Sequence, residues 1–465
     1  MDDAMRFESR MSDADALMWT IEKDPLLRST ILAVSLLDRA PDRDRLMARL
    51  ERGSREIPRL RQRVVGNPWS LAPPRWEVDP NFDLHYHVRS MRAPGNGTVR
   101  DLLDACAPIA MQGFDRARPL WEVWVVDGLE GDRAALVQKV HHTITDGVGG
   151  VKMAMVLLDL ERHPAADDGP APPAPEPRVL GPWARLLDAA GHEARRQAGV
   201  ARRAVGSAPE AAAGVLRDPV GAARSAADLA GSVRRLLAPV TEPLSPVLRE
   251  RSLRLRLDTL TVPLPDLKAA AKRVDGKLND AFVAAVTGGL RRYHEAHGTP
   301  VDALRMTMPI NLRDASTDAL AGNRFVPARF TIPVGIADPR ERMRVTRDLL
   351  RRQRAEPALA LTDALAGVLF RLPRSVATTV FGSMLKGIDV VTSNVPGAPV
   401  PIYLAGARVT AQFAFGPPSG AALNVTLLSH LDDCAIGVTS DAAAVPDPDC
   451  LTTCLQEGFD EVLKG

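Results

Sequence analysis

The residues best suited to chemistry lie in one short stretch of this sequence, QKVHHTITDGVGGVK, at positions 138–152. Two adjacent histidines, His141 and His142, end an apolar run, and Asp146 and Gly147 follow shortly after them. A neutral imidazole can accept a proton near physiological pH, so one histidine could act as a general base. The same residue types could instead bind a metal ion, and the glycines could surround a phosphate group.

Several of these alternatives fit the spacing poorly. Adjacent histidines in a strand point to opposite faces, and nothing nearby supplies the other ligands of a closed metal site, so we expect no metal. Lys152 stands where a dinucleotide-binding fingerprint needs a small residue. The chain has neither a G-x-S-x-G motif nor an activated-cysteine signature. General base catalysis and a histidine that only satisfies a buried backbone group remain open.

The whole motif, His141-His142-Thr143-Ile144-Thr145-Asp146-Gly147, resembles the HHxxxDG signature of condensation domains and chloramphenicol-acetyltransferase-like acyltransferases. More narrowly, the sequence resembles the bacterial wax ester synthase/diacylglycerol acyltransferase (WS/DGAT) family. The further matches, which span nearly the whole chain, are Pro119-Leu120-Trp121-Glu122, Asn279-Asp280, MPINLR (308–313), Gly322-Asn323-Arg324-Phe325 and SNVPG (393–397) followed by YLAGARV.

The resemblance implies an α/β fold of the α+β type. Two chloramphenicol-acetyltransferase-like halves would form a central tunnel with His142 at its centre. The implied reaction is acyl transfer from a long-chain acyl-CoA to a diacylglycerol or a fatty alcohol, which yields triacylglycerol or wax ester. His142 would deprotonate the hydroxyl as general base, with no covalent acyl-enzyme and no cofactor, since acyl-CoA is a substrate.

Four residues are expected to support His142. In related two-domain acyltransferases the corresponding arginine pairs with the motif aspartate, so the resemblance implies an Asp146–Arg313 ion pair between the halves; a surface position for Arg313 is the alternative. Gly147 permits a close backbone approach. His141 should face away from its neighbour, so it would shape the pocket or bind the backbone, with a second-base role as the alternative.

Other motif residues have both a structural and a functional interpretation. Asn279 could be a helix N-cap, or could lie with Asp280 near the active site, as the resemblance implies. Pro119-Leu120-Trp121 would start a strand and pack an aromatic ring in the core, or contact the acyl chain. Thr145 would tune the pocket. Asn394 lies in SNVPG, which by itself is typical of a turn and by resemblance lies near the tunnel.

Two strands joined by a glycine-containing turn are predicted to position the histidines, in LWEVWVVDGLEGDRAALVQKVHH (120–142). If the second strand runs through His142, alternation places Val140 and His142 on one face and Lys139 and His141 on the other. We expect His142 to lie on the buried face.

The 465 residues exceed one ordinary core, which predicts two domains. We expect an N-terminal half over 1–165 with the histidine motif, a Pro/Ala/Arg-rich linker with crossover helices over 166–250, and a C-terminal half over 251–465. The middle segment could lie on an anionic membrane surface as a basic amphipathic helix, or could pack between the two domains.

Composition narrows the partners and the compartment. The formal net charge of +2 gives no reason to expect nucleic acid. Four cysteines without CxxC spacing predict neither a disulfide framework nor a zinc site, so a reducing compartment is expected. We see no secretory signal and no apolar run of about 18 residues. A cytoplasmic protein is expected, in contact with the inner membrane face or lipid droplets at most from the side.

Three competing functions remain. A condensation-like enzyme would take its acyl group from a carrier protein, and a non-catalytic lipid-binding protein would keep the tunnel without turnover. His141 to Asp146 also fits the HxxxxD pattern of glycerol-phosphate acyltransferases, which would place the motif on another fold.

Overall fold

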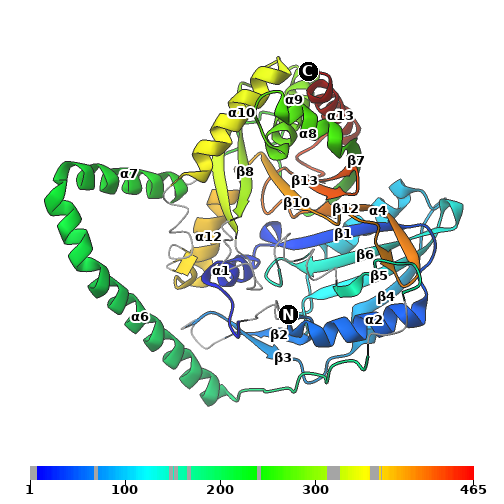
Figure 1. The fold of residues 1–465 in the computed structure, drawn as a ribbon, viewed down its shortest axis with the longest axis horizontal. Coiled ribbons are helices and arrows are strands. Elements are labelled where there is room, and N and C mark those ends of the chain that lie inside the picture. The colour runs from blue at the N-terminus through cyan, green and yellow to red at the C-terminus, as the bar shows by residue number, and fades with distance from the viewer. Residues whose placement is uncertain are drawn as a thin grey trace.

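The computed structural model of the protein contains two six-stranded sheets covered by helices, which is the mixed α/β class with two halves that the sequence predicts (Figure 1). It describes residues 8–66, 72–145, 150, 156–164, 169–237, 242–311, 325–356, 366, 367 and 369–465.

The first sheet carries the histidine motif. Val34 and Val137 contribute to the apolar cluster on one of its faces, and Trp121 and Leu136 to the cluster on the other, so both faces are buried. In spatial order its strands are β11 (Tyr403–Leu404), β12 (Ala407–Phe415), β1 (Thr30–Leu37), β6 (Arg133–His141), β5 (Trp121–Leu129) and β4 (Val88–Arg92). Two of these strands come from beyond residue 400, which a simple division of the chain into consecutive halves does not anticipate.

The predicted hairpin forms from β5 and β6, which pair antiparallel. Gly131 in its turn has φ of 72°, and Gly128, in the irregular last part of β5, has φ of 79°. Glycine adopts these left-handed conformations without the steric cost that a side chain would add. A glycine-containing turn therefore joins β5 to β6, as the sequence predicts.

Helices cover the first sheet, and a small ribbon flanks it. Helix α2 begins after its cap Asp42, whose carboxylate accepts the Arg45 N–H, and it buries Leu46 and Leu50. The elements are α1 (Asp13–Ile21), α2 (Arg43–Glu56), α3 (Leu84–His87), α4 (Val99–Met111), short 3-10 turns at Pro25–Leu27, Pro58–Arg61 and Glu130–Asp132, and the paired strands β2 (Gln62–Val65) and β3 (Arg75–Val78).

The second sheet is mixed, because β10 pairs parallel with both of its neighbours. Its strands, in spatial order, are β7 (Leu255–Pro263), β14 (Asp433–Asp441), β13 (Leu423–His430), β10 (Val390–Pro396), β8 (Ala303–Asn311) and β9 (Phe325–Pro333). The prediction that SNVPG forms a turn is wrong for Asn394, which lies inside β10 opposite Leu427. Gly397 follows the strand, where a Cβ would collide with the carbonyl oxygen of Ser429.

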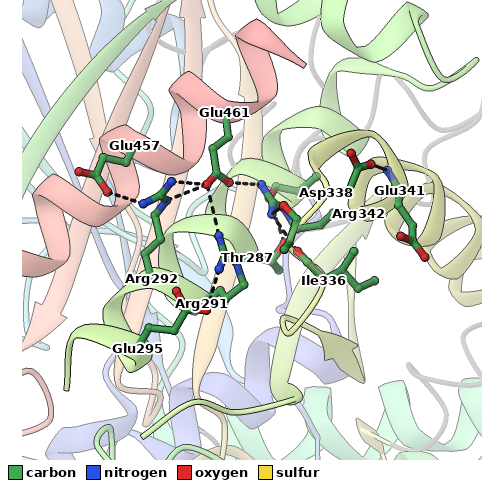
Figure 2. Close-up of polar contacts among 12 residues, drawn as sticks. Thr287, Arg291, Arg292, Glu295, Ile336, Asp338, Glu341, Arg342, Glu457 and Glu461 are labelled. Carbon is green, nitrogen blue, oxygen red and sulfur yellow. Dashed lines mark hydrogen bonds and ion pairs between the residues drawn. The ribbon is translucent and has the colours of Figure 1, made fainter. Parts of the chain in front are cut away.

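An ion-pair network joins the helices on the second sheet (Figure 2). Glu461 accepts hydrogen bonds from Arg342 at 2.7 Å and from Arg292 at 2.8 Å, and the Arg342 side chain is completely buried. Burial acts to raise the pKa of Glu461, but both arginines outweigh it and hold the pKa below its ordinary value. The helices of the network are α9 (Leu278–Ala296), α10 (Pro339–Arg354) and α13 (Pro448–Lys464), while α8 (Leu264–Lys272) packs against α9 and α12 (Arg374–Leu385) packs against α1.

The two halves interlock. Strand β12 of the first sheet crosses β14 of the second so closely that a Cβ on Gly437 would collide with the carbonyl oxygen of Ala414. Arg100 of α4 bridges to Asp258 of β7 at 2.6 Å. The halves are therefore held together by backbone packing and by charge.

A long limb leads from one half to the other. It consists of α6 (Pro182–Arg217) and α7 (Pro219–Leu237), which lie outside both sheets in Figure 1, where α7 returns toward the second half. None of the helices in the described part of the chain is both long and apolar enough to cross a bilayer.

Candidate active site

The backbone at the two histidines is held from both sides of β6. The His141 N–H donates to the carbonyl oxygen of Leu120 at 3.0 Å, and the His142 N–H donates to that of Ser29 at 2.8 Å. Strand β6 ends at His141, and His142 is the first residue of the following turn. His142 therefore leaves the sheet at a fixed point, directly beside the start of β1.

The prediction that His142 occupies the buried face is wrong. His141 is 1% exposed, whereas His142 is partly exposed. Strand alternation stops at His141, and the central position of β6 buries the face of Lys139 and His141 as well. Partial exposure suits a base that must reach a substrate.

The His141 ring is fully engaged. Its Nδ1 accepts the Thr143 backbone N–H at 3.1 Å, so in the neutral ring the proton sits on Nε2. That Nε2 lies 2.8 Å from an oxygen of Glu22 and donates to it. The edges of Trp19 and Phe114 enclose the ring. With both nitrogens bonded, the His141 ring is held in one orientation.

Glu22 connects the two histidines. The oxygen that receives His141 also accepts the Ser29 N–H at 2.7 Å, and the Ser29 carbonyl holds His142. Burial acts to raise the pKa of Glu22. This effect is outweighed by the charge and hydrogen bond of His141, by the Ser29 N–H and by Arg116, so the pKa of Glu22 lies below its ordinary value. Sequence reasoning missed Glu22, which lies 119 residues from His141 and belongs to no motif.

A second buried charge pair lies on the same strands. Lys139 is completely buried, its ammonium lies 3.7 Å from Glu122 and it stands over the ring of Phe114. Burial, with the nearby Arg89, lowers the pKa of Lys139 although Glu122 opposes the shift. Glu122 is the last residue of the PLWE motif, so part of that motif serves to neutralise a lysine two residues from His141.

The rest of that motif packs in the core. Pro119, Leu120 and Trp121 are buried, and the Trp121 indole N–H donates to the Leu60 carbonyl oxygen at 2.7 Å. Its ring stacks on that of His87 at a centroid distance of 4.4 Å. These contacts favour the structural interpretation of the motif over acyl-chain contact.

Asn279 is not the N-cap of α9, as one of its two interpretations held. The cap position is Lys277, whose N–H donates to the Asp280 carboxylate at 2.7 Å. The Asn279 amide instead lies 3.3 Å from the sulfur of Met308. The start of α9 thus meets the MPIN segment of β8, which brings two separate motifs together. A Lys-x-x-Asp spacing carries no strong capping signal, which explains the error.

The remaining predicted residues divide into two groups. Thr145 is buried just beyond the histidines, and Asn394 is half-buried in β10. Asp146, Gly147 and Arg313 lie outside the described residues. The Asp146–Arg313 ion pair therefore stays a prediction.

A pocket opens at the seam between the halves, with an empty volume of about 630 Å³ that includes its open mouth. Leu32, Met111 and Phe415 contribute an apolar wall, and Thr30 lines it as well. His142 does not line this pocket, but Thr30 pairs with His141 across the strands. The pocket thus reaches the start of β1, at the residue that pairs with His141.

Comparison with known proteins places this geometry in a family. Residues 11–282 match the wax ester synthase/diacylglycerol acyltransferase catalytic domain, and residues 321–463 match the WS/DGAT C-terminal domain. A Mycobacterium tuberculosis protein that carries the name diacylglycerol O-acyltransferase is 40% identical over 458 residues, which cover 98% of this chain and 92% of the relative. A second one is 31% identical over 452 residues, which cover 94% and 93%.

Two solved structures share the fold. The wax ester synthase/diacylglycerol acyltransferase from Marinobacter aquaeolei VT8 aligns with a TM-score of 0.61 at 21% identity and covers 97% of this chain and 98% of its own. The first condensation domain of the calcium-dependent antibiotic synthetase also aligns with a TM-score of 0.61, at 15% identity, and covers 98% and 95%.

Proposed function

Because the chain belongs to the wax ester synthase/diacylglycerol acyltransferase family and is thus an acyltransferase, we propose that it moves the acyl group of a long-chain acyl-CoA onto a lipid hydroxyl. Diacylglycerol is the first acceptor to consider, since the mycobacterial relatives carry its name. A long-chain fatty alcohol is the second, because the family description includes wax ester synthesis.

In the proposed reaction His142 is the general base. Its neutral ring takes the proton of the acceptor hydroxyl while the oxygen attacks the thioester carbonyl. The tetrahedral intermediate collapses as the carbon–sulfur bond breaks, and the imidazolium returns the proton to the departing thiolate. The products are an ester and free CoA.

One observation carries this assignment. Of the two motif histidines, His142 alone is partly exposed, while His141 is buried with both ring nitrogens bonded to Thr143 and Glu22. The local fold therefore supports a division in which His141 orients and His142 reacts.

The test compares His142→Ala with wild type in an esterification assay that uses palmitoyl-CoA with either diacylglycerol or hexadecanol. Loss of a general base should lower kcat by roughly 10² to 10⁴-fold. His85→Ala is the control, because that histidine side chain is 86% exposed on α3. Equal rates for His142→Ala and wild type would refute the base assignment.

The identity of the acyl donor needs a separate assay. The fold is shared with a condensation domain, so an acyl-carrier-protein thioester should be assayed beside palmitoyl-CoA. Faster turnover with the carrier-bound donor would replace acyl-CoA in the proposal. Binding of acyl-CoA without transfer to any alcohol would favour a non-catalytic lipid-binding protein.

A further inference from the structure

Helix α6 contacts the protein body through its polar side. Ala189 on this side is completely buried. The ion pairs that anchor the helix are Asp188 with Arg10 and Arg75, Glu193 with Arg371, and Arg196 with Asp13. An amphipathic helix on a globular protein ordinarily turns its apolar stripe toward the core. In α6 the polar side, and not the apolar stripe, faces the rest of the protein.

The opposite side of α6 is an exposed apolar stripe. At about 100° per residue its members fall within a sector of about 60°. Trp183 is 79% exposed, Leu187 72%, Val205 74% and Leu216 84%. At a rise of about 1.5 Å per residue the stripe is about 50 Å long. Its described members, all exposed, are Trp183, Leu187, Ala194, Ala198, Ala201, Val205 and Leu216.

Basic charge accompanies this stripe. Residues 182–237 contain nine arginines and five acidic residues, a formal net charge of +4, whereas the whole chain carries only +2. Two of those acidic residues, Asp188 and Glu193, are paired with arginines of the body. Arg195 and Arg202 are exposed along one edge of the stripe.

We propose that the exposed stripe of α6 docks the enzyme on an anionic lipid surface. A helix that lies in a lipid interface needs an apolar face to insert among acyl chains and basic residues to meet phosphate headgroups. A tryptophan near the start of the helix suits the headgroup level, where aromatic rings gather. The extension of the limb beyond both sheets leaves α6 room to lie flat on such a surface (Figure 1).

This inference deepens the proposed function, since both proposed acceptors reside in a lipid phase. Docking would hold α6 at the lipid surface in which the acceptor is dissolved. The ion pairs of α6 with the rest of the protein would keep the two sheets close to that surface. The test measures binding without turnover, so it can fail separately from the proposed chemistry.

The experiment is flotation of the full-length protein with phosphatidylcholine vesicles that contain or lack phosphatidylglycerol. Wild type should float with the anionic vesicles. The triple variant Leu187→Ser, Val205→Ser, Leu216→Ser should bind them roughly tenfold or more weakly, because burying even one large apolar side chain is worth on the order of tenfold in partition. Arg195→Gln with Arg202→Gln should weaken binding to anionic vesicles and leave binding to neutral ones unchanged.

Two controls keep the outcome interpretable. Val400→Ser removes an exposed apolar side chain outside the limb and should float like wild type. His142→Ala should also float like wild type even if it is inactive, which separates docking from catalysis. Circular dichroism should show that the triple variant keeps its helices, since its substituted side chains are exposed.

Other outcomes would overturn the proposal. Flotation of the triple variant at wild-type strength would show that the stripe does not dock on lipid. Light scattering that reveals a wild-type dimer, a monomeric triple variant and no vesicle binding would show that a second copy of the chain covers the stripe. Equal wild-type binding to neutral and anionic vesicles would remove the anionic headgroup from the proposal.

Discussion

The oxygen of Glu22 that holds both His141 and Ser29 sets the geometry of the motif at the residue scale. Substrate contact is not needed for this role. A carboxylate that accepts two hydrogen bonds at one oxygen fixes the ring of one histidine and, through Ser29, the backbone of the next. The reactive geometry therefore depends on a residue outside the motif.

We expect Glu22→Gln to lower kcat by roughly 10- to 100-fold with little change in KM, because small misplacements of a reacting group are costly. The same change should reduce the free energy of unfolding by about 1.5 to 3 kcal/mol, the usual value of hydrogen bonds to a charged group. Steady-state kinetics and denaturant unfolding provide the two measurements. Glu130→Gln, at an exposed position in the hairpin turn, is the matched control.

A purely structural role for Glu22 would give another result. In that case kcat per folded molecule would equal that of wild type, and only the yield or stability of the folded protein would fall.

Residue-scale sequence reasoning depends on local information. The HHxxxDG pattern singled out His141 and His142, whose catalytic roles stay predictions. Their burial was predicted in the wrong order because the end of β6 cannot be read from alternation alone. The role of Glu22 arises from a contact between distant segments, which a single sequence does not reveal.

At the scale of elements, the arginine–glutamate network fixes how α9, α10 and α13 pack on the second sheet. Arg342 is completely buried and Glu461 is its carboxylate partner at 2.7 Å. A buried charge that loses its partner keeps its desolvation cost, so breaking such a pair is strongly destabilising.

We expect Glu461→Ala to lower the free energy of unfolding by about 3 to 5 kcal/mol, the range for breaking a buried ion pair. Glu457→Ala is the matched control on the same helix, because Glu457 is 48% exposed and pairs with Arg292, which is itself partly exposed. That change should cost at most about 1 kcal/mol. Equal losses in the two variants, measured by denaturant unfolding, would contradict the importance of burial at Arg342.

The network should also make stability depend on pH. The arginines hold the folded pKa of Glu461 below its ordinary value of 4.5. Its contribution to stability is therefore present above pH 4.5 and is lost as the pH falls through the lowered pKa. Unfolding midpoints measured across this acidic range should fall less steeply in Glu461→Gln than in wild type. Parallel slopes would contradict the assignment.

Elements with strong local patterns were predicted well, and their ends were not. The β5–β6 hairpin follows directly from its two apolar runs and the glycine-containing turn between them. SNVPG looks like a turn because Asn, Pro and Gly favour turns, yet pairing with β13 keeps Asn394 in a strand. Tertiary contacts decided the outcome there.

At the scale of the whole molecule, the two halves exchange structure rather than merely touch. Strand β12 follows much of the second half in sequence but pairs with β1 in the first sheet, with Leu32 opposite Phe415. Sequence reasoning predicted two halves around a crossover, and it could not predict this exchange, because no local pattern records which distant strand a given strand will join.

Gly437 marks the tightest point of that junction, so we expect Gly437→Ala to destabilise the protein by about 1 to 3 kcal/mol, as overpacking does. Gly206→Ala is the matched control, since a Cβ there meets nothing within 4 Å. Within a helix that change should be neutral or stabilising by up to about 1 kcal/mol. Thermal unfolding of both variants measures these changes in stability. An unchanged stability of Gly437→Ala would show that the two sheets can separate at this point without cost.

Because β12 pairs with β1, the two halves should stay together after proteolytic cleavage between them. The limb offers nine arginines to trypsin, and none of its peptide bonds belongs to either sheet. After cleavage within the limb the two fragments should still co-elute as one particle, because β1 of the earlier fragment remains paired with β12 of the later one. Either fragment made alone would instead present an open strand edge, which invites aggregation.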